Sequence, residues 1–388
     1  MSTPTTSIPA RAGLTTLCAA LLLVTAACTK EPAKATTEAK PAAPAEGEKT
    51  PSAPETPADT WRWSVPEGLE APAVPAENPM SDDKVSLGHD LFFDKRLSVD
   101  GSRSCYSCHQ NELGNADGRA KALGPGDKEL TRNTPTIWNV AYHSALYWDG
   151  RSPTLEKQML GAWKGGNMGV GDDLAAKAAE IGGLPEYGDR IRKVFGLATA
   201  DPITPDHLAM AISAYERTLL CGAAPWDTGK LEGAAQRGWE LFRDKGACAT
   251  CHTGTNFTDD KFHNVGIAAQ KPGEGDLGRG GHTKDAAENH RFRTPTLRNV
   301  SKTAPYFHDG SVTDLREAVK YMAKGGDRSV QGLDENLADR GLTDAEIDDI
   351  VTFLGTLECP NNLAVVGDQA VPGIGAAPVP VLTPPPPT

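Results

Sequence analysis

Two short segments of this chain carry the same pattern of thiol and imidazole side chains. They read Cys105-Tyr106-Ser107-Cys108-His109 and Cys248-Ala249-Thr250-Cys251-His252. In a C-x-x-C-H segment the two thiols bond to the vinyl groups of a porphyrin, and the histidine ligates its iron. A zinc site would need a second ligand pair at each segment, and a redox-active C-x-x-C would need a βαβ unit. Neither is visible, so the sequence predicts two covalent c-type haems, attached at Cys105, Cys108, Cys248 and Cys251 with His109 and His252 as iron ligands.

The stretches that flank these two segments repeat each other. The shared patterns are Gly-x-x-Leu-Phe-x-Asp-Lys at 88–95 and 238–245, Thr-Pro-Thr-x-x-Asn-Val at 134–140 and 294–300, and Asp-Gly at 149–150 and 309–310. A duplication with one haem segment in each copy indicates two cytochrome c-like domains rather than a solenoid.

The segments between these landmarks predict helices and loops. Residues 205–220 predict a helix with Thr204 as its N-cap, and 343–357 predict another with acidic residues in its first turn. Residues 313–322 carry apolar side chains at helical spacing. No convincing run of strands is present, and the 40 glycines and 30 prolines indicate long irregular loops. The predicted fold class is mainly α, with two cytochrome c-like domains that each hold one covalent haem.

The amino terminus has the features of an export signal. Residues 1–28 carry one charge, Arg11, and an apolar run too short to span a bilayer, which predicts a signal peptide. Cys28 follows small residues, as in a lipoprotein processing site, so both lipidation at Cys28 and simple secretion are open. Exported thiols tend to pair, and Cys221 and Cys359 each close the last predicted helix of a domain. We therefore predict a disulfide between them.

Composition divides the rest of the chain. Residues 29–60 and the Pro-rich tail at 363–388 have few large apolar side chains and predict a disordered linker and tail. The folded part then comprises an N-terminal cytochrome c domain at 61–225 and a C-terminal one at 226–362. The net charge of −12 argues against a nucleic-acid partner.

Taken in order, the motifs resemble the bacterial diheme cytochrome c peroxidase family, which includes MauG-type and MbnH-like enzymes. The resemblance spans residues 79–357 and depends on the segments 87–98, 132–136, 147–151, 294–300 and 303–310 and on both haem motifs. It implies that the amino-terminal haem reacts with hydrogen peroxide and that the carboxy-terminal haem accepts electrons from a small periplasmic cytochrome c or cupredoxin. It is also compatible with a homodimer.

The resemblance also implies roles for individual residues. Trp148 stands where the family has a tryptophan between the two haems, and Gln158 matches a distal glutamine that orients peroxide. A calcium ion in the family is held by the residues that match the Asn133 side chain and the Thr303 and Pro305 backbone carbonyls. Such hard oxygen ligands suit calcium.

The resemblance places the second haem's distal ligand in the helix after 309–310. Met322 stands where the peroxidases have a methionine and MauG-type enzymes a tyrosine. A thioether favours reduced iron, which suits an electron store. Tyr321, about 100° further round the helix, is the rival ligand.

Two positions depart from the family. Pro125 stands where many members have a histidine that blocks the first iron, and proline cannot ligate a metal. The acidic glutamate of the peroxide-binding face is replaced by Asn167 or Met168, neither of which can transfer a proton. Asp172 or Asp173 could substitute only if that loop folds inward.

These features leave three functions open. The leading hypothesis is a cytochrome c peroxidase that reduces hydrogen peroxide to water at the first haem. The alternatives are a MauG- or MbnH-like oxidation of a tryptophan on a partner protein, and a diheme electron-transfer cytochrome without peroxide chemistry.

Overall fold

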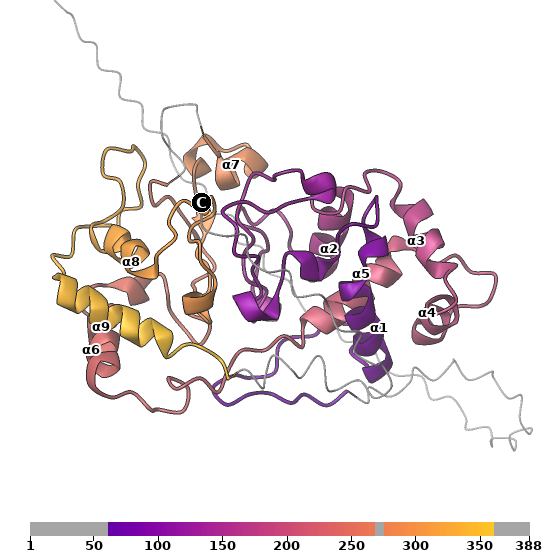
Figure 1. Ribbon diagram of the computed structural model, residues 1–388, viewed down its shortest axis with the longest axis horizontal. Coiled ribbons are helices and arrows are strands. Elements are labelled where there is room, and N and C mark those ends of the chain that lie inside the picture. Colours follow the sequence, from indigo (N-terminus) through magenta and orange to yellow (C-terminus); the bar gives the residue numbers. More distant parts are fainter. Residues whose placement is uncertain (1–60, 268–274, 361–388) are drawn as a thin grey trace, which may run out of the picture. The chain divides into compact units, whose positions relative to one another are not determined.

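The computed structural model describes residues 61–267 and 275–360, and these residues are mainly helical (Figure 1). Their α-helices are α1 Asp82–Phe93, α2 Leu155–Lys164, α3 Leu174–Gly182, α4 Gly188–Phe195, α5 Pro205–Glu216, α6 Gly233–Arg243, α7 Gly278–Thr283, α8 Leu315–Ala323 and α9 Asp344–Gly355. Their one-turn 3₁₀ helices are η1 Lys95–Leu97, η2 Cys105–Ser107, η3 Asn111–Leu113, η4 Pro125–Asp127, η5 Val140–Tyr142, η6 Cys248–Thr250, η7 Ala286–Glu288 and η8 Val300–Lys302. The described strands, β1 Phe262–His263 and β2 Phe292–Arg293, form one antiparallel pair with Phe262 opposite Arg293. The predicted signal peptide 1–28 with Cys28, the linker 29–60 and the tail 363–388 lie outside the described residues.

Each half of the described chain is organised around one helix crossing. Helix α1 packs on α5 at Gly88, where a Cβ atom would lie 1.9 Å from the Ala211 carbonyl oxygen. Helix α6 packs on α9 in the same way, and a Cβ atom on Gly238 would lie 1.9 Å from the Asp349 carbonyl oxygen. Only glycine permits this approach, so the repeated glycine of the sequence pattern sets both crossings.

The predicted helices form with small changes in their bounds. Helix α9 begins after Thr343, whose side chain accepts a hydrogen bond from the Glu346 backbone nitrogen in a capping box. Helix α5 ends at Glu216, four residues before the predicted end. Helix α8 covers residues 315–323 and is capped by Asp314, whose side chain accepts from the Glu317 backbone nitrogen.

Two separate apolar clusters fill the two halves. The first includes Trp163 with helices α1, α2 and α5, and the second is centred on Phe242, Phe257 and Phe353 of the segment from α6 to α9. We propose the domain boundary at 225–226 because the clusters divide close to it. Among the described residues, no helix has both the length and the apolar character that crossing a membrane requires.

The predicted disulfide between Cys221 and Cys359 is confirmed, and it joins the ends of the two halves with Cα atoms 5.5 Å apart. Repeat-related asparagines hold both cysteines. The Asn139 side-chain oxygen accepts from the Cys221 backbone nitrogen at 2.7 Å, and that of Asn299 accepts from the Cys359 nitrogen at 2.8 Å. The disulfide therefore closes a pseudo-symmetric arrangement that the repeated Thr-Pro-Thr-x-x-Asn-Val pattern encodes.

Candidate functional site

Both C-x-x-C-H segments fold into a 3₁₀ turn that presents the histidine to a cavity. The Nδ1 atom of His109 lies 3.0 Å from the Asn115 carbonyl oxygen, and that of His252 lies 3.0 Å from the Phe257 carbonyl oxygen. In each case Nδ1–H donates, which leaves the Nε2 lone pair for a metal. Burial lowers the pKa of His109 to about 4 and also lowers the pKa of His252, so both rings are neutral near pH 7. Both have the protonation state that ligation of iron requires.

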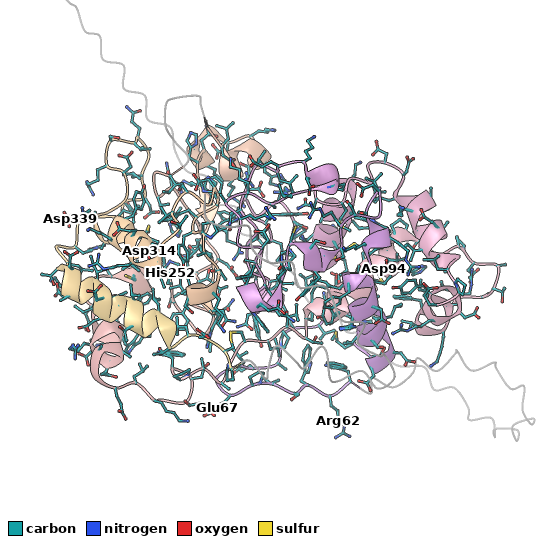
Figure 2. The ribbon with its side chains drawn as sticks, viewed as in Figure 1. Arg62, Glu67, Asp94, His252, Asp314 and Asp339 are labelled. Atoms are coloured by element: carbon teal, nitrogen blue, oxygen red, sulfur yellow. A yellow bond between two sulfur atoms is a disulfide. The ribbon has the colours of Figure 1, made fainter. Side chains whose placement is uncertain are left out.

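His252 is labelled in Figure 2, and the cavity beside it has a volume of about 260 Å³. Its walls are largely apolar side chains from α6, α8 and α9, namely Phe242, Leu315, Ala318, Val319, Ile350 and Leu354. Met322 lines the same cavity as Cys248, Cys251 and His252. This donor set, two thiols, a neutral imidazole and a thioether within apolar walls, fits a covalently held haem.

The rival ligand Tyr321 is held elsewhere. Its hydroxyl donates to the Val265 carbonyl oxygen at 2.8 Å and accepts from the Asp327 backbone nitrogen at 2.9 Å. It is not among the residues that line the cavity beside His252. The geometry therefore favours Met322 over Tyr321, and the Met322 ligand stays a prediction.

The group formed by Cys251, Asp259 and His263 is not a second metal centre. Their ligand atoms lie within 4.8 Å of one another. However, the Cys251 sulfur belongs to the C-x-x-C-H segment and is used by the haem thioether bond. The His263 imidazole is instead held between two carboxylates, at 3.1 Å from Asp259 and 2.6 Å from Asp334.

A smaller cavity of about 70 Å³ lies beside His109. Its lining residues are Leu97, Ser104, Cys105, Cys108, His109, Gln158, Met159, Ala162, Trp163, Asn167, Met168 and Glu216. It thus brings together Gln158, Asn167 and Met168, three residues that the sequence placed on the distal face. Asp172 and Asp173 do not line it, and Asp172 is 89% exposed in an ion pair with Lys164.

Trp148 and the three residues of the calcium hypothesis all line the larger cavity. The indole nitrogen of Trp148 donates to the Asn133 carbonyl oxygen at 2.9 Å, and its own carbonyl oxygen accepts from the Arg293 nitrogen at 2.8 Å. The Asn133 side-chain nitrogen donates to the Arg119 carbonyl oxygen at 2.8 Å, so its amide oxygen is the atom that remains for a cation. Thr303 and Pro305 lie on the same cavity wall.

Comparison with known proteins identifies the family. The di-haem cytochrome c peroxidase family matches residues 82–236, and the cytochrome c family matches residues 235–358. The chain is 37% identical over 306 residues to the methylamine utilization protein MauG of Methylorubrum extorquens, covering 76% of this chain and 83% of that protein. The chain belongs to the di-haem cytochrome c peroxidase family. The predicted family, the mainly α fold class and the two c-type haems are thereby confirmed, and the protein is an oxidoreductase of the cytochrome c peroxidase type.

Two further similarities extend this result. The cytochrome c551 peroxidase of Pseudomonas aeruginosa is 34% identical over 291 residues, which cover 72% of this chain and 80% of that enzyme. A solved structure of a MauG-like protein associated with microbial copper homeostasis matches with a TM-score of 0.73 and 31% identity, covering 79% of this chain and 98% of that chain. The di-haem peroxidase architecture thus spans nearly all of the described residues.

Sequence reasoning missed one residue of the di-haem peroxidase site. Glu216, at the end of α5, is buried and lines the cavity beside His109. A comparison of the two copies of the internal repeat could have revealed Glu216. When Cys221 is aligned with Cys359, Glu216 falls opposite the apolar Leu354.

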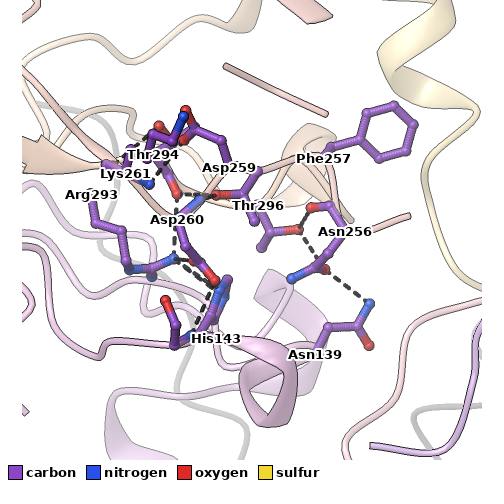
Figure 3. A network of polar contacts seen from close by, with 12 residues as sticks. Asn139, His143, Asn256, Phe257, Asp259, Asp260, Lys261, Arg293, Thr294 and Thr296 are labelled. Atoms are coloured by element: carbon purple, nitrogen blue, oxygen red, sulfur yellow. Dashed lines mark hydrogen bonds and ion pairs between the residues drawn. The ribbon is translucent and has the colours of Figure 1, made fainter. Parts of the chain in front are cut away.

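Charged side chains connect the two halves next to Trp148. Figure 3 shows His143 of the first half against Asp260 and Arg293 of the second. The His143 Nδ1 atom lies 2.7 Å from the Asp260 carboxylate, and the Arg293 guanidinium donates to the same carboxylate at 3.0 Å. Arg132 pairs at 2.7 Å with Asp149 of its own half and at 2.6 Å with Asp276 of the other. These buried and half-buried pairs fix the backbone on both sides of Trp148.

Proposed function

We propose that this protein reduces hydrogen peroxide to water at the haem of Cys105, Cys108 and His109. One peroxide molecule takes up two protons and two electrons and gives two water molecules. When bound, the haem iron supplies a coordination site for peroxide and a route for electrons. The observation that carries the proposal is the cavity beside His109. Its lining includes Gln158, Asn167 and Glu216, whose polar side chains can contact a bound peroxide.

The remaining residues have supporting roles in this proposal. Cys248, Cys251 and His252 would hold the second haem, which would supply an acceptor for electrons from a small cytochrome c or cupredoxin, and Met322 would favour its reduced state. Trp148 lies on the route between the haems, and Gln158 orients peroxide through its amide. Asn133, Thr303 and Pro305 supply neutral oxygen atoms for one calcium ion, which suits the hard-ligand preference of this cation.

We propose that the protein acts in the periplasm. The predicted export signal at 1–28 supports this place of action, either with a lipid anchor at Cys28 or after simple secretion. Haem attachment then follows export. A homodimer is part of the same proposal and is tested by the mass of the holoprotein in solution.

A second function has its own support. The second candidate is a MauG- or MbnH-like, peroxide-dependent oxidation of a tryptophan on a partner protein. Its support is the similarity of the chain to a MauG and to a solved MauG-like protein. In that case peroxide would be consumed only when the partner is present. A prereduced donor would not replace the partner.

The proposal is tested by peroxide consumption of the holoprotein with a prereduced small cytochrome c as the electron donor. We expect two donor molecules to be oxidised for each peroxide. Gln158→Leu should slow the reaction with peroxide and leave donor oxidation at the second haem intact. Absence of turnover, with donor oxidation by the second haem still present, would identify an electron-transfer cytochrome instead.

We predict further that the first haem iron has no protein ligand on its distal side in the fully oxidised protein. The loop 123–132 offers no His, Met, Cys or Tyr, and none of its residues lines the cavity beside His109. Lys128 of this loop is exposed and lies outside that cavity lining. Peroxide and cyanide should therefore bind without prior reduction of the second haem.

The measurement for this prediction is an electron paramagnetic resonance spectrum of the diferric holoprotein. A strong high-spin ferric signal from one haem is expected. Two low-spin signals would contradict the prediction. A high-spin signal that appears only in Met168→Ala would then identify the Met168 thioether, which lines this cavity, as the ligand that closes the site.

A further inference from the structure

Glu216 is a buried carboxyl group that the packing of the protein leaves partly unsatisfied. Its residue is 6% exposed, and its Oε2 atom has no hydrogen-bond partner among the described residues. It lines the cavity beside His109 together with Cys105, Gln158 and Met168. Buried polar atoms without a partner are rare in native proteins and call for an explanation.

Helix packing does not supply that explanation. Tyr215 and Phe353 are the equivalent aromatic residues of the two helix crossings, and the next residues are Glu216 and Leu354. Leu354 is 3% exposed and lines the cavity beside His252. The same structural position in the second half is thus occupied by a leucine, so the packing of the helices does not require a carboxyl group there. The carboxyl group is specific to the cavity in which we place peroxide chemistry.

The surrounding charges do not neutralise Glu216 through an ion pair. Arg217, whose charge acts on Glu216, donates instead to Glu156 of α2 at 2.7 Å. Glu156 also accepts from the Asn78 side chain at 2.7 Å. Burial raises the pKa of Glu216 to about 8; the Arg217 charge opposes this shift and the Glu156 charge adds to it. The group is therefore mainly a neutral carboxylic acid near pH 7.

We propose that Glu216 is the proton-donating residue of the first haem cavity. Its carboxylic acid gives its proton to the outer peroxide oxygen as the O–O bond breaks, and that oxygen leaves as water. The reduced donor supplies the two electrons that the bond cleavage consumes. The carboxylate then takes a proton from solvent, and the inner oxygen becomes the second water with one further solvent proton. This inference rests on the proposed peroxidase function and supplies the acid that Asn167 and Met168 cannot provide.

The test compares Glu216→Gln, Glu216→Asp and Glu216→Leu in the holoprotein. Glutamine keeps the shape but cannot supply a proton, so the rate of peroxide cleavage should fall by about 10²–10⁴-fold, the usual contribution of general acid catalysis. Aspartate should restore part of this loss. Leucine, the residue of the repeat, should lower the rate as glutamine does and leave the melting temperature equal to or above that of the wild type.

A second readout does not depend on turnover. The infrared spectrum of the holoprotein at pH 7 should contain the C=O band of a protonated carboxylic acid, shifted in D₂O and absent in Glu216→Gln. Asp117→Asn is the matched control. Asp117 is a buried carboxyl near Cys108 that is satisfied by the Thr134 hydroxyl at 2.9 Å and lies outside the cavity lining. This control should keep the Glu216 band and the cleavage rate.

The outcomes separate this inference from the proposed function. If the wild type is active and the cleavage rate of Glu216→Gln lies within threefold of the wild-type rate, Glu216 is not the proton donor. The peroxidase function would still stand. An inactive wild type whose Glu216 band is present would overturn the function and with it the catalytic role. Absence of the band in active wild-type enzyme would show an ionised carboxylate and overturn the proton donor.

Discussion

Met322→Ala is expected to convert the second haem from low-spin to high-spin iron and to lower its reduction potential. The expected fall is on the order of 0.1 V, within the roughly 0.8 V range that axial ligands span. The reason is that α8 places Met322 on the cavity that His252 also lines. A thioether ligand stabilises ferrous iron, so its loss favours the ferric state. Turnover with a reduced donor should fall because the second haem would no longer hold an electron at the donor's potential.

The matched control is Tyr321→Phe. Its hydroxyl bonds to the backbone around Val265 and Asp327, so its removal should alter that loop and leave the haem spectrum unchanged. The measurements are the absorption band of oxidised thioether-ligated haem, the electron paramagnetic resonance spectrum and a redox titration. If Met322→Ala keeps the wild-type spectrum and Tyr321→Phe loses it, Met322 is not the ligand.

The features that sequence predicts well here are those encoded in short segments. Each C-x-x-C-H segment contains its own attachment chemistry, and the repeated Gly-x-x-Leu-Phe-x-Asp-Lys pattern predicts the duplication. The structure adds that the glycines of this pattern, Gly88 and Gly238, lie at the two helix crossings. Helix α9 is predicted from the acidic residues of its first turn, and the structure shows that one of them, Glu346, forms a capping box with Thr343. The Cys221–Cys359 disulfide needed one additional premise, the export of the chain.

Features that depend on distant residues were not predictable in the same way. Glu216 stands beside Arg217, and in sequence this pair has the composition of a solvated helix end. Only packing shows that Arg217 turns to Glu156, 61 residues earlier, and leaves Glu216 in the cavity. The bond from His143 to Asp260 spans 117 residues, and no local pattern marks it.

The loop that contains Asn167 and Met168 in place of the family's glutamate shows the same limit of prediction from sequence. Sequence alignment left Asn167 and Met168 as equal occupants of one position and left Asp172 open. In the structure both Asn167 and Met168 line the cavity beside His109, whereas Asp172 is exposed. Two positive-φ glycines, Gly169 and Gly171, turn the chain between these residues. The loop geometry therefore separates residues that differ by only four positions.

Breaking one buried ion pair of the second half is expected to lower the free energy of unfolding more than breaking any surface pair. The Arg298 and Asp227 side chains are both fully buried, with the guanidinium bonded to the carboxylate at 2.5 and 2.8 Å. Arg298 also donates to the Thr255 carbonyl oxygen at 2.9 Å. The equivalent residue of the first half is the buried Trp138, so the repeat itself does not require a charge at this position.

Asp227→Asn is expected to lower the free energy of unfolding by about 3–5 kcal/mol, because it leaves the Arg298 charge buried without its counter-charge. At about 2–4 °C per kcal/mol, the melting temperature should fall by on the order of 10 °C.

Calorimetry of the oxidised holoprotein measures the melting temperature, with Arg237→Gln as the control. Arg237 pairs with Asp349 at 2.7 Å, but its side chain is 60% exposed, so water replaces the lost contact and the change should be small. Equal losses in both variants would show that the Arg298 charge is compensated by the Thr255 carbonyl alone. In that case the Asp227 carboxylate would contribute no more to the free energy of unfolding than the partner of a surface ion pair does. Its burial would then not explain the loss of stability.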